Sequence, residues 1–310
     1  MQNPIIVITG ATASGKTAIS FDVAPKFNSE IICADSMTVY KGMDIGTDKP
    51  TLLSINKKKL TKNKDGAYII KGIPHHLLDI LEPSDDFNVA IFKKLVEEKV
   101  IEIQSRGKMP ILVGGSLLYI DSFAYDFLMP EVKPDEKLRK ELNKKSEDEL
   151  FNQLVELDPD AEWTVDKKNK RRVIRALEVC LKTGQPFTAQ KKSAGLRKNL
   201  LYLAVDRERE ELNKKINKRV NEMMEAGFLE EVKALYKKYD HSTAMQATGY
   251  RQLVDYLEGK IDLEKAVEET KKSHRRFAKR QQTWLRRNQD KILIENSTDA
   301  EREIRKFIEN

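Results

Sequence analysis

The residues with the clearest chemistry form a glycine-rich loop near the N-terminus. The segment GATASGKT at 10–17 matches the pattern G-x-x-x-x-G-K-[ST], follows an apolar run and precedes a helical pattern. In such a loop, backbone N–H groups and the positive end of the helix bind phosphate oxygens. Lys16 adds a positive charge, and Thr17 offers a hydroxyl to Mg²⁺. The pattern predicts a di- or triphosphate site made of Gly10, Ala11, Thr12, Ala13, Ser14, Gly15, Lys16 and Thr17.

A carboxylate, Asp35, ends the next apolar run, IICAD. Ligands of open α/β sheets bind beyond the carboxyl ends of the strands, so Asp35 is expected beside the loop. It is predicted to act as a general base, to orient a metal or substrate, or to cap the next turn. The third apolar run ends ILVGGS, without the Mg²⁺-binding acid that common P-loop NTPases carry. The residues alone leave two enzyme classes open, a kinase and a transferase whose loop holds a diphosphate leaving group.

Lys and Arg gather in two segments with helical periodicity. Eight of the seventeen residues at 271–287 are cations, interleaved with Phe277 and Trp284, and six of the nine at 167–175 are cations. A solvated helix face would explain one such segment. Arg forms bidentate contacts with phosphates, and unstacked bases stack on aromatic and guanidinium planes. Two of these segments beside a phosphate loop favour binding of a nucleic acid.

Composition excludes several classes of protein. The net charge of the 310 residues is 56 − 49 = +7, and no run reaches the roughly 18 apolar residues of a membrane span. No signal peptide is predicted, because no basic segment precedes the first apolar run. Cys33 and Cys180 are expected to be buried free thiols, which excludes a cysteine zinc site and favours a reducing cytoplasm. His75 and His76 point to opposite faces of an extended segment, so a structural or substrate-orienting role is favoured over metal binding.

Short apolar runs are expected to form the buried parallel strands that position these residues. They are IIVIT (5–9), IICA (31–34) and ILVGG (111–115). A helix between the last two runs is predicted to have Ser84 or Asp85 as its cap.

The rest of the chain is predicted to be mainly helical, apart from one strand-like run. LLYLAV, which ends at Val205, is expected to return to the sheet, and a long helix is expected from about 263 to 288. We predict an α/β fold, a P-loop NTPase-like parallel sheet flanked by helices, with a helical insertion domain. The expected core is 1–127 and 197–310, and the expected insertion is 128–196.

In their order along the chain, seven segments resemble those of bacterial tRNA dimethylallyltransferases (tRNA isopentenyltransferases). The resemblance covers nearly the whole length, and only the phosphate loop is specific when taken alone. The segments are GATASGKT (10–17), DSMTVYKGMDIGTDKP (35–50), GIPHHLLDI (72–80), PILVGGSLLYI (110–120), RRVIRALEV (171–179), GYRQL (249–253) and AKRQQTWLRR (278–287).

The resemblance implies transfer of a dimethylallyl group from dimethylallyl diphosphate to N6 of adenosine 37, 3′ of the anticodon, in tRNAs reading codons that begin with U. It implies that Lys16 and Mg²⁺, held by Thr17, neutralise the leaving diphosphate, and that no ATP is consumed. Asp35 would take the proton of the attacking amine. Ser116, at the position of a family threonine, would support the reacting groups.

The resemblance also implies binding of the tRNA anticodon stem-loop, with the adenine flipped out of its stack. The insertion and the 278–287 helix are expected to clamp the stem-loop, and the enzyme is expected to be a cytoplasmic monomer. The implied tRNA-binding residues are Asp35, Ser36, Met37, Thr38, Ser116, Arg139, Arg171, Arg172, Arg175, Gln246, Gly249, Tyr250, Arg251, Lys279, Arg280, Gln281, Thr283, Trp284 and Arg286.

Some positions depart from the family pattern. Thr38 stands where a glutamine is usual, Ala11 replaces a common proline, and the segment 51–72 is longer and more basic, without an assigned role. Its Lys-rich part, 57–64, is predicted to be a solvated loop. The alternatives are an adenylate isopentenyltransferase, which needs no tRNA track, a P-loop kinase, and an RNA-binding protein without activity.

Overall fold

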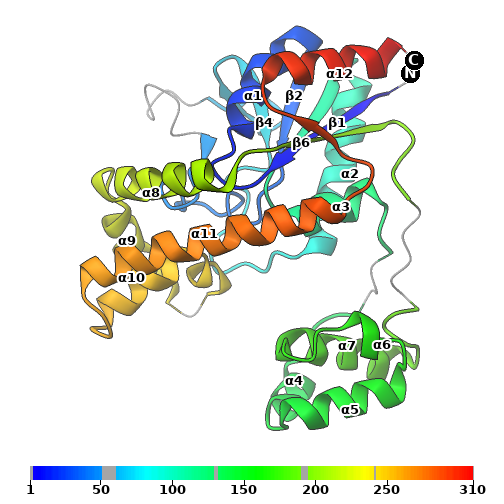
Figure 1. The fold of residues 1–310 in the computed structure, drawn as a ribbon, viewed down its shortest axis with the longest axis vertical. Helices are drawn as coiled ribbons and strands as arrows, with labels where there is room; N and C mark the ends of the chain where they lie inside the picture. Colours follow the sequence, from blue (N-terminus) through cyan, green and yellow to red (C-terminus); the bar gives the residue numbers. More distant parts are fainter. Residues whose placement is uncertain (1–2, 51–60, 129–131, 190–194, 241, 310) are drawn as a thin grey trace. The chain divides into compact units, whose positions relative to one another are not determined.

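The chain folds into two compact units. In the computed structural model these are Met1–Ala124 with Lys198–Asn310, and Tyr125–Arg197 (Figure 1). The expectation for the second unit was 128–196. The structure describes residues 3–50, 61–128, 132–189, 195–240 and 242–309.

The first unit is built on a seven-stranded sheet with the order β3-β4-β2-β5-β1-β6-β7. Neighbouring strands are parallel except β3 and β4, which pair antiparallel at one edge. The four central strands are buried along their whole length, which is why they appear as continuous apolar runs in the sequence. The predicted strands are confirmed as β1, β2, β5 and β6, whereas the short β3, β4 and β7 were not predicted. The bounds are β1 (Ile5–Gly10), β2 (Ser29–Cys33), β3 (Tyr68–Ile70), β4 (Ile73–His76), β5 (Met109–Gly114), β6 (Leu200–Val205) and β7 (Ile292–Ile294).

Helices cover the sheet on both sides (Figure 1). Ile6 and Ile8 of β1 pack in one cluster with Ile19 of α1 and Ile304 of α12. Helices α2 and α3 pack against each other on the other side of the sheet. The helical elements of this unit are α1 (Lys16–Val23), η1 (Ala24–Phe27), α2 (Val89–Ser105), α3 (Leu117–Ala124), α8 (Arg209–Glu225), α9 (Phe228–Tyr239), η4 (Thr243–Gln246), α10 (Tyr250–Leu257), α11 (Leu263–Arg287) and α12 (Ser297–Glu309).

The cap predicted for α2 is wrong. The side chain of Asn88, and not that of Ser84 or Asp85, accepts hydrogen bonds from backbone N–H groups of the first turn, at 3.0 and 3.1 Å. Asn, Asp and Ser are about equally good N-caps. Residue type therefore did not decide among three neighbouring candidates.

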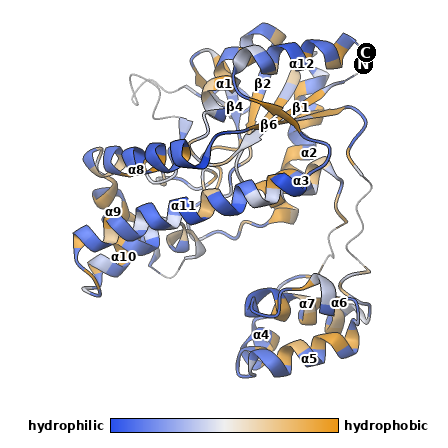
Figure 2. Ribbon diagram, in the orientation of Figure 1, coloured by the Kyte–Doolittle hydropathy of each residue, from blue (hydrophilic) through white to orange (hydrophobic). Residues whose placement is uncertain are grey.

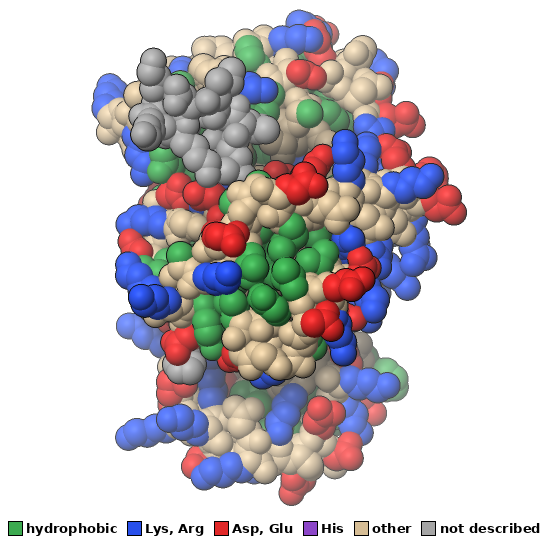
Figure 3. Space-filling model, turned by 90° about the vertical axis from the view of Figure 1, so that its left-hand side faces the viewer, with side chains coloured by type: hydrophobic (Ala, Val, Ile, Leu, Met, Phe, Trp, Pro, Cys, Tyr) green, Lys and Arg blue, Asp and Glu red, His purple; other side chains and the backbone are tan. Residues whose placement is uncertain are grey.

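The chain after β6 forms a group of packed helices, α8 to α11. The long helix expected at 263–288 is confirmed as α11, which packs against α8 and α10. Its buried residues recur every three or four positions and include His274, Ala278 and Gln281, while its other faces are hydrophilic (Figure 2). Hydrophobic side chains reach the surface on the face that carries α9 and α10, within a rim of charged residues (Figure 3).

The described part of the second unit is helical, as predicted. It comprises α4 (Glu136–Asn143), α5 (Glu147–Leu157), α6 (Ala161–Thr164) and α7 (Lys170–Thr183). Leu150 and Leu154 of α5 pack with Val173 and Leu177 of α7 in a core of its own. Ser146 and Glu149 form a capping box that starts α5.

Cys33 and Cys180 are buried free thiols, as predicted. Of the Lys-rich segment at 57–64, the part up to residue 60 lies outside the described residues, and 61–64 precede β3. None of the helices within the described ranges has the length and apolar character that a membrane crossing requires.

Candidate active site

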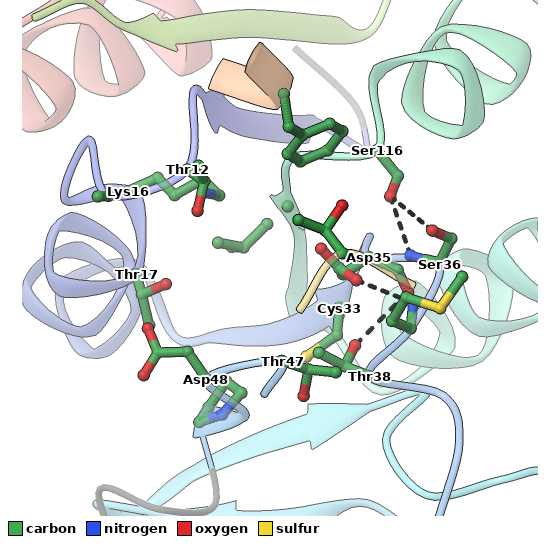
Figure 4. A pocket seen from close by; sticks show the side chains of 18 of the residues that line it. Thr12, Lys16, Thr17, Cys33, Asp35, Ser36, Thr38, Thr47, Asp48 and Ser116 are labelled. Carbon is green, nitrogen blue, oxygen red and sulfur yellow. Dashed lines mark hydrogen bonds between the residues drawn. The ribbon is translucent and has the colours of Figure 1, made fainter. Parts of the chain in front are cut away.

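A cavity of about 510 Å³ opens at the carboxyl ends of β1, β2 and β5. Parallel strands end at the same edge of a sheet, so the loops that follow them meet there. The cavity is lined by the glycine loop 10–17, by the segment that follows β2, by the turn 114–116 after β5, and by α8, α10 and α11. Lys16 and Thr17 lie on one side of it, and Asp35, Ser36 and Ser116 lie on the other (Figure 4).

The glycine loop has the backbone geometry that a phosphate-binding loop requires. A Cβ on Gly10 would lie 2.7 Å from Ser14 Oγ. Gly15 has a φ of 95°, a backbone angle that residues other than glycine rarely adopt. The backbone N–H of Ser14 donates to Ala11 O at 3.2 Å and closes the turn. Helix α1 begins at Lys16, so its N-terminus faces the cavity.

The surroundings of Lys16 lower the pKa of its side chain. Burial, with a further contribution from the nearby Arg219, lowers the pKa of Lys16 to about 8, against the opposing effect of Asp35 and Asp48. Its Nζ donates to Ala11 O at 3.3 Å. The site holds positive charge that an anionic ligand would stabilise.

Arg219 is a site residue that no sequence pattern indicated. It comes from α8, donates through Nη1 to Thr12 Oγ1 at 3.0 Å, and pairs through Nη2 with Asp48 Oδ2 at 3.2 Å. Asp48 also lines the cavity, in the segment after β2. Arg219 looks like any other cation of a polar helix, and no local pattern distinguishes it.

Three buried polar atoms of the glycine loop and of two lining residues, Arg219 and His274, have no hydrogen bond partner among the described residues. They are Ser14 Oγ, Arg219 Nε and His274 Nε2. Burial lowers the pKa of His274 to about 4, so its imidazole is neutral near pH 7. Buried polar atoms are nearly always paired in folded proteins. Their concentration here fits a site that a polar ligand completes.

Asp35 lies opposite the glycine loop with one oxygen engaged. Its Oδ1 accepts a hydrogen bond from Met37 N at 2.9 Å, so it caps the turn after β2, one of the roles expected of it. Its Oδ2 has no hydrogen bond within the described part of the chain, which leaves this oxygen for a ligand. The carboxylate lines the cavity.

Ser116 is connected to the Asp35 segment through its hydroxyl. Ser36 N donates to Ser116 Oγ at 2.9 Å, and the two hydroxyl oxygens are 3.3 Å apart. A Cβ on Gly114 would lie 1.9 Å from Ala34 O, so only glycine allows the ends of β2 and β5 to approach this closely. Thr38 is buried, and its Oγ1 donates to Asp35 O at 3.5 Å.

Gln281 connects two loops of the site. Its Oε1 accepts from Thr12 N, and its Nε2 donates to Gly115 O, both at 2.8 Å. The side chain is 4% exposed. Both the oxygen and the nitrogen of its amide are therefore used in hydrogen bonds within the protein.

The other residues expected to bind tRNA from this unit fall into three groups. Gln246, Tyr250 and Arg280 line the cavity, and the buried Tyr250 donates its hydroxyl to Glu231. Gly249 is the buried residue that precedes α10. The remaining side chains, which do not line the cavity and are exposed, are Arg251, Lys279, Thr283, Trp284 and Arg286.

The other residues that are expected to bind RNA belong to the second unit. Arg139 and Arg175 both bond to the buried carboxylate of Glu178, with N–O distances from 2.6 to 2.9 Å. Arg171 and Arg172 are exposed. Two of these four arginines thus help to hold the unit together, and two face solvent.

The donor atoms present suit a weakly held Mg²⁺ ion better than a protein-enclosed metal. Within the described ranges, no three His, Cys, Asp or Glu residues are placed to hold a metal ion. His76 Nε2 bonds to Glu30 and His75 Nδ1 to Ile73 O, so both imidazoles make hydrogen bonds within the protein, and His75 also lines the cavity. Thr17 and Asp48 line the same side of the cavity (Figure 4), and Mg²⁺ is usually held by one or two such oxygens with phosphates and waters.

Comparison with known proteins gives consistent matches. Residues 38–288 match the family model described as IPP transferase. A tRNA dimethylallyltransferase of Bacillus licheniformis is 43% identical over 296 residues, which cover 93% of this chain and 89% of that protein. A tRNA dimethylallyltransferase of Caldanaerobacter subterraneus is 41% identical over 299 residues, which cover 92% of this chain and 90% of that protein.

Solved structures agree with the sequence matches. The tRNA isopentenylpyrophosphate transferase of Bacillus halodurans has a TM-score of 0.69 and 36% identity, with 99% of this chain and 96% of that chain covered. A eukaryotic dimethylallyltransferase described as acting on tRNA has a TM-score of 0.76 and 29% identity, with 94% of this chain and 73% of that chain covered.

Proposed function

The chain belongs to the IPP transferase family, whose matched members are tRNA dimethylallyltransferases, and we propose that it modifies tRNA in the same way. The proposed reaction moves a dimethylallyl group from dimethylallyl diphosphate to N6 of adenosine 37, next to the anticodon, in tRNAs that read codons beginning with U. One observation carries the proposal. A phosphate loop and the half-engaged carboxylate of Asp35 line opposite sides of one cavity.

The glycine loop is the proposed site of the diphosphate. In the reaction the bond between the allylic carbon and the diphosphate oxygen breaks, and the oxygen keeps the electron pair. Lys16, Arg219 and the N-terminus of α1 lie where they would stabilise that charge. Mg²⁺ held by Thr17 and Asp48 would supply further neutralisation when bound. The unpaired Ser14 Oγ and Arg219 Nε support a ligand rich in oxygen atoms.

Asp35 is the proposed base for the attacking amine. As N6 of adenine forms its bond to the allylic carbon, one of its two protons passes to Asp35 Oδ2. The bond from Met37 N to Oδ1 holds the carboxylate in one orientation while Oδ2 accepts this proton. Ser116 positions the segment through Ser36, and Thr38 forms the adjacent wall.

The tRNA is proposed to be held by cations of both units. Arg280 at the cavity, with Lys279 and Arg286 on α11, would contact phosphates in the first unit. Arg171 and Arg172 would do the same in the second, with Arg139 and Arg175 shaping that surface through Glu178. We propose that the enzyme acts as a monomer. We place this activity in the cytoplasm, where tRNA is modified.

Transfer of a labelled prenyl group tests the proposal. The protein is incubated with radiolabelled dimethylallyl diphosphate, Mg²⁺ and unmodified tRNA, and in parallel with AMP, or with ATP and small acceptors. We expect label in tRNA at the adenosine 3′ of the anticodon and little in AMP, because AMP cannot engage the cations of both units. Equal rates with AMP would favour an adenylate isopentenyltransferase. Phosphate transfer from ATP without prenyl transfer would identify a kinase.

A further inference from the structure

Trp163 is an exposed aromatic side chain in the second unit. It lies on α6 and is 83% exposed, although an indole is among the largest apolar groups in proteins. The other tryptophan of the chain, Trp284, is 39% exposed and donates its Nε1 hydrogen to Asp121 at 2.6 Å. The indole of Trp163 makes no hydrogen bond or ring contact within the described ranges, and only the backbone N–H of this residue is engaged, with Asp160 O at 3.3 Å.

The fold holds Trp163 in this outward position. Ala161 and Val165, two residues to either side, are buried in the core of the unit at 0% and 5% exposure. On a helical turn, a residue between two buried ones four apart points away from the core. Arg172 of α7 also donates to Thr164 O at 3.4 Å and ties the end of α6 to the next helix. The indole is therefore presented on a supported backbone.

Cations without acidic partners lie next to α6 in the sequence and at the start of α7. Of the six cations in 167–175, Lys167 pairs with Asp148, and Arg175 pairs with Glu178. Lys170 Nζ donates to two backbone carbonyls. No carboxylate in the described chain pairs with the remaining three side chains, which are Lys168, Arg171 and Arg172.

We propose that Trp163 stacks on an unpaired base of the tRNA while Lys168, Arg171 and Arg172 bind the flanking phosphates. This inference rests on the proposed function and adds a contact to it. A ring face next to several cations is the combination with which proteins bind single-stranded nucleic acids. A protein partner fits less well, because the centres of protein interfaces are depleted in charge, whereas charged residues flank Trp163 along the chain, among them Glu162, Asp166 and Lys167.

Binding of an unmodified tRNA by Trp163 variants tests this inference. Trp163→Ala should weaken tRNA binding about 5- to 150-fold, the range that one lost base stack implies. Trp163→Phe, which keeps a ring face, should stay close to the wild type. Leu181→Ala is the matched control, because Leu181 is 44% exposed on α7 of the same unit and should have no effect. An equal loss with Leu181→Ala, or none with Trp163→Ala, overturns the inference.

Tryptophan fluorescence gives an independent readout, since the chain has two tryptophans. The difference between the wild type and Trp163→Phe reports on Trp163 alone. With tRNA bound, this difference signal should be quenched and protected from acrylamide. If tRNA binds normally and the signal stays accessible, the inference fails while the proposed function stands. If the wild type does not bind tRNA, the proposed function itself fails. Protection by raised protein concentration without RNA would identify a protein contact and overturn the inference.

Discussion

We predict that Lys16 sets the pH dependence of diphosphate binding. Burial and Arg219 lower the pKa of Lys16 from 10.5 to about 8 in the free protein. A difference of this size corresponds to about 3 kcal/mol between the charged and neutral forms. A bound diphosphate stabilises the ammonium group, so the pKa of Lys16 must rise in the complex. Binding at a pH above 8 therefore requires uptake of a proton.

The sign and size of the effect follow from this linkage. Well below pH 8, Lys16 is charged in both states and contributes no pH dependence. Above pH 8, Lys16 of the free protein loses its proton first, so the affinity for diphosphate falls by up to tenfold per pH unit, until the pKa of Lys16 in the complex is reached. Asp48 raises the pKa of Lys16, so Asp48→Asn should move the start of the fall to lower pH.

Calorimetric binding of inorganic pyrophosphate between pH 6.5 and 10 measures the effect. Lys16→Arg is the control, because its guanidinium does not titrate in this range while the ionisation of pyrophosphate is common to both proteins. The ratio of wild-type to Lys16→Arg affinity should be flat below pH 8 and fall above it. A ratio that is constant to pH 10, or a fall that Asp48→Asn moves to higher pH, would refute the reasoning.

Three further predictions follow from the site and the cationic helices. Asp35→Asn should lower kcat about 10²- to 10⁴-fold and leave tRNA affinity nearly unchanged, and normal turnover would exclude Asp35 as the base. Gln281→Leu leaves Thr12 N and a backbone carbonyl unpaired, so denaturant unfolding should show a loss of about 2–6 kcal/mol, with weaker pyrophosphate binding; unchanged stability would contradict the bridging role. Replacing Arg171 and Arg172 by Gln should reduce the log–log salt slope of tRNA binding by about 1.4, and an unchanged slope would mean that neither side chain contacts a phosphate.

Local chemistry made several features of this protein predictable from its sequence. The glycine loop has a conformation that few sequences allow, and its spacing is therefore visible without any tertiary contact. Strands β1, β2, β5 and β6 are buried on both faces and appear as apolar runs, and α11 repeats its buried residues at helical spacing. The hairpin of β3 and β4 was missed, because its strands have three and four residues and little alternation.

The tertiary structure alone decided which other side chains complete the site. Arg219 meets Thr12 across 207 residues, and Gln281 meets the same residue across 269. Contacts between residues so far apart in the chain cannot be predicted from the neighbouring sequence, because they depend on how helices α8 and α11 pack against the sheet. The family resemblance implied that Gln281 contacts tRNA, and only its burial between two loops shows that its amide connects them. The sequence thus determined the chemistry that a single loop can carry, whereas the convergence of distant residues on that loop came from the packing of the fold.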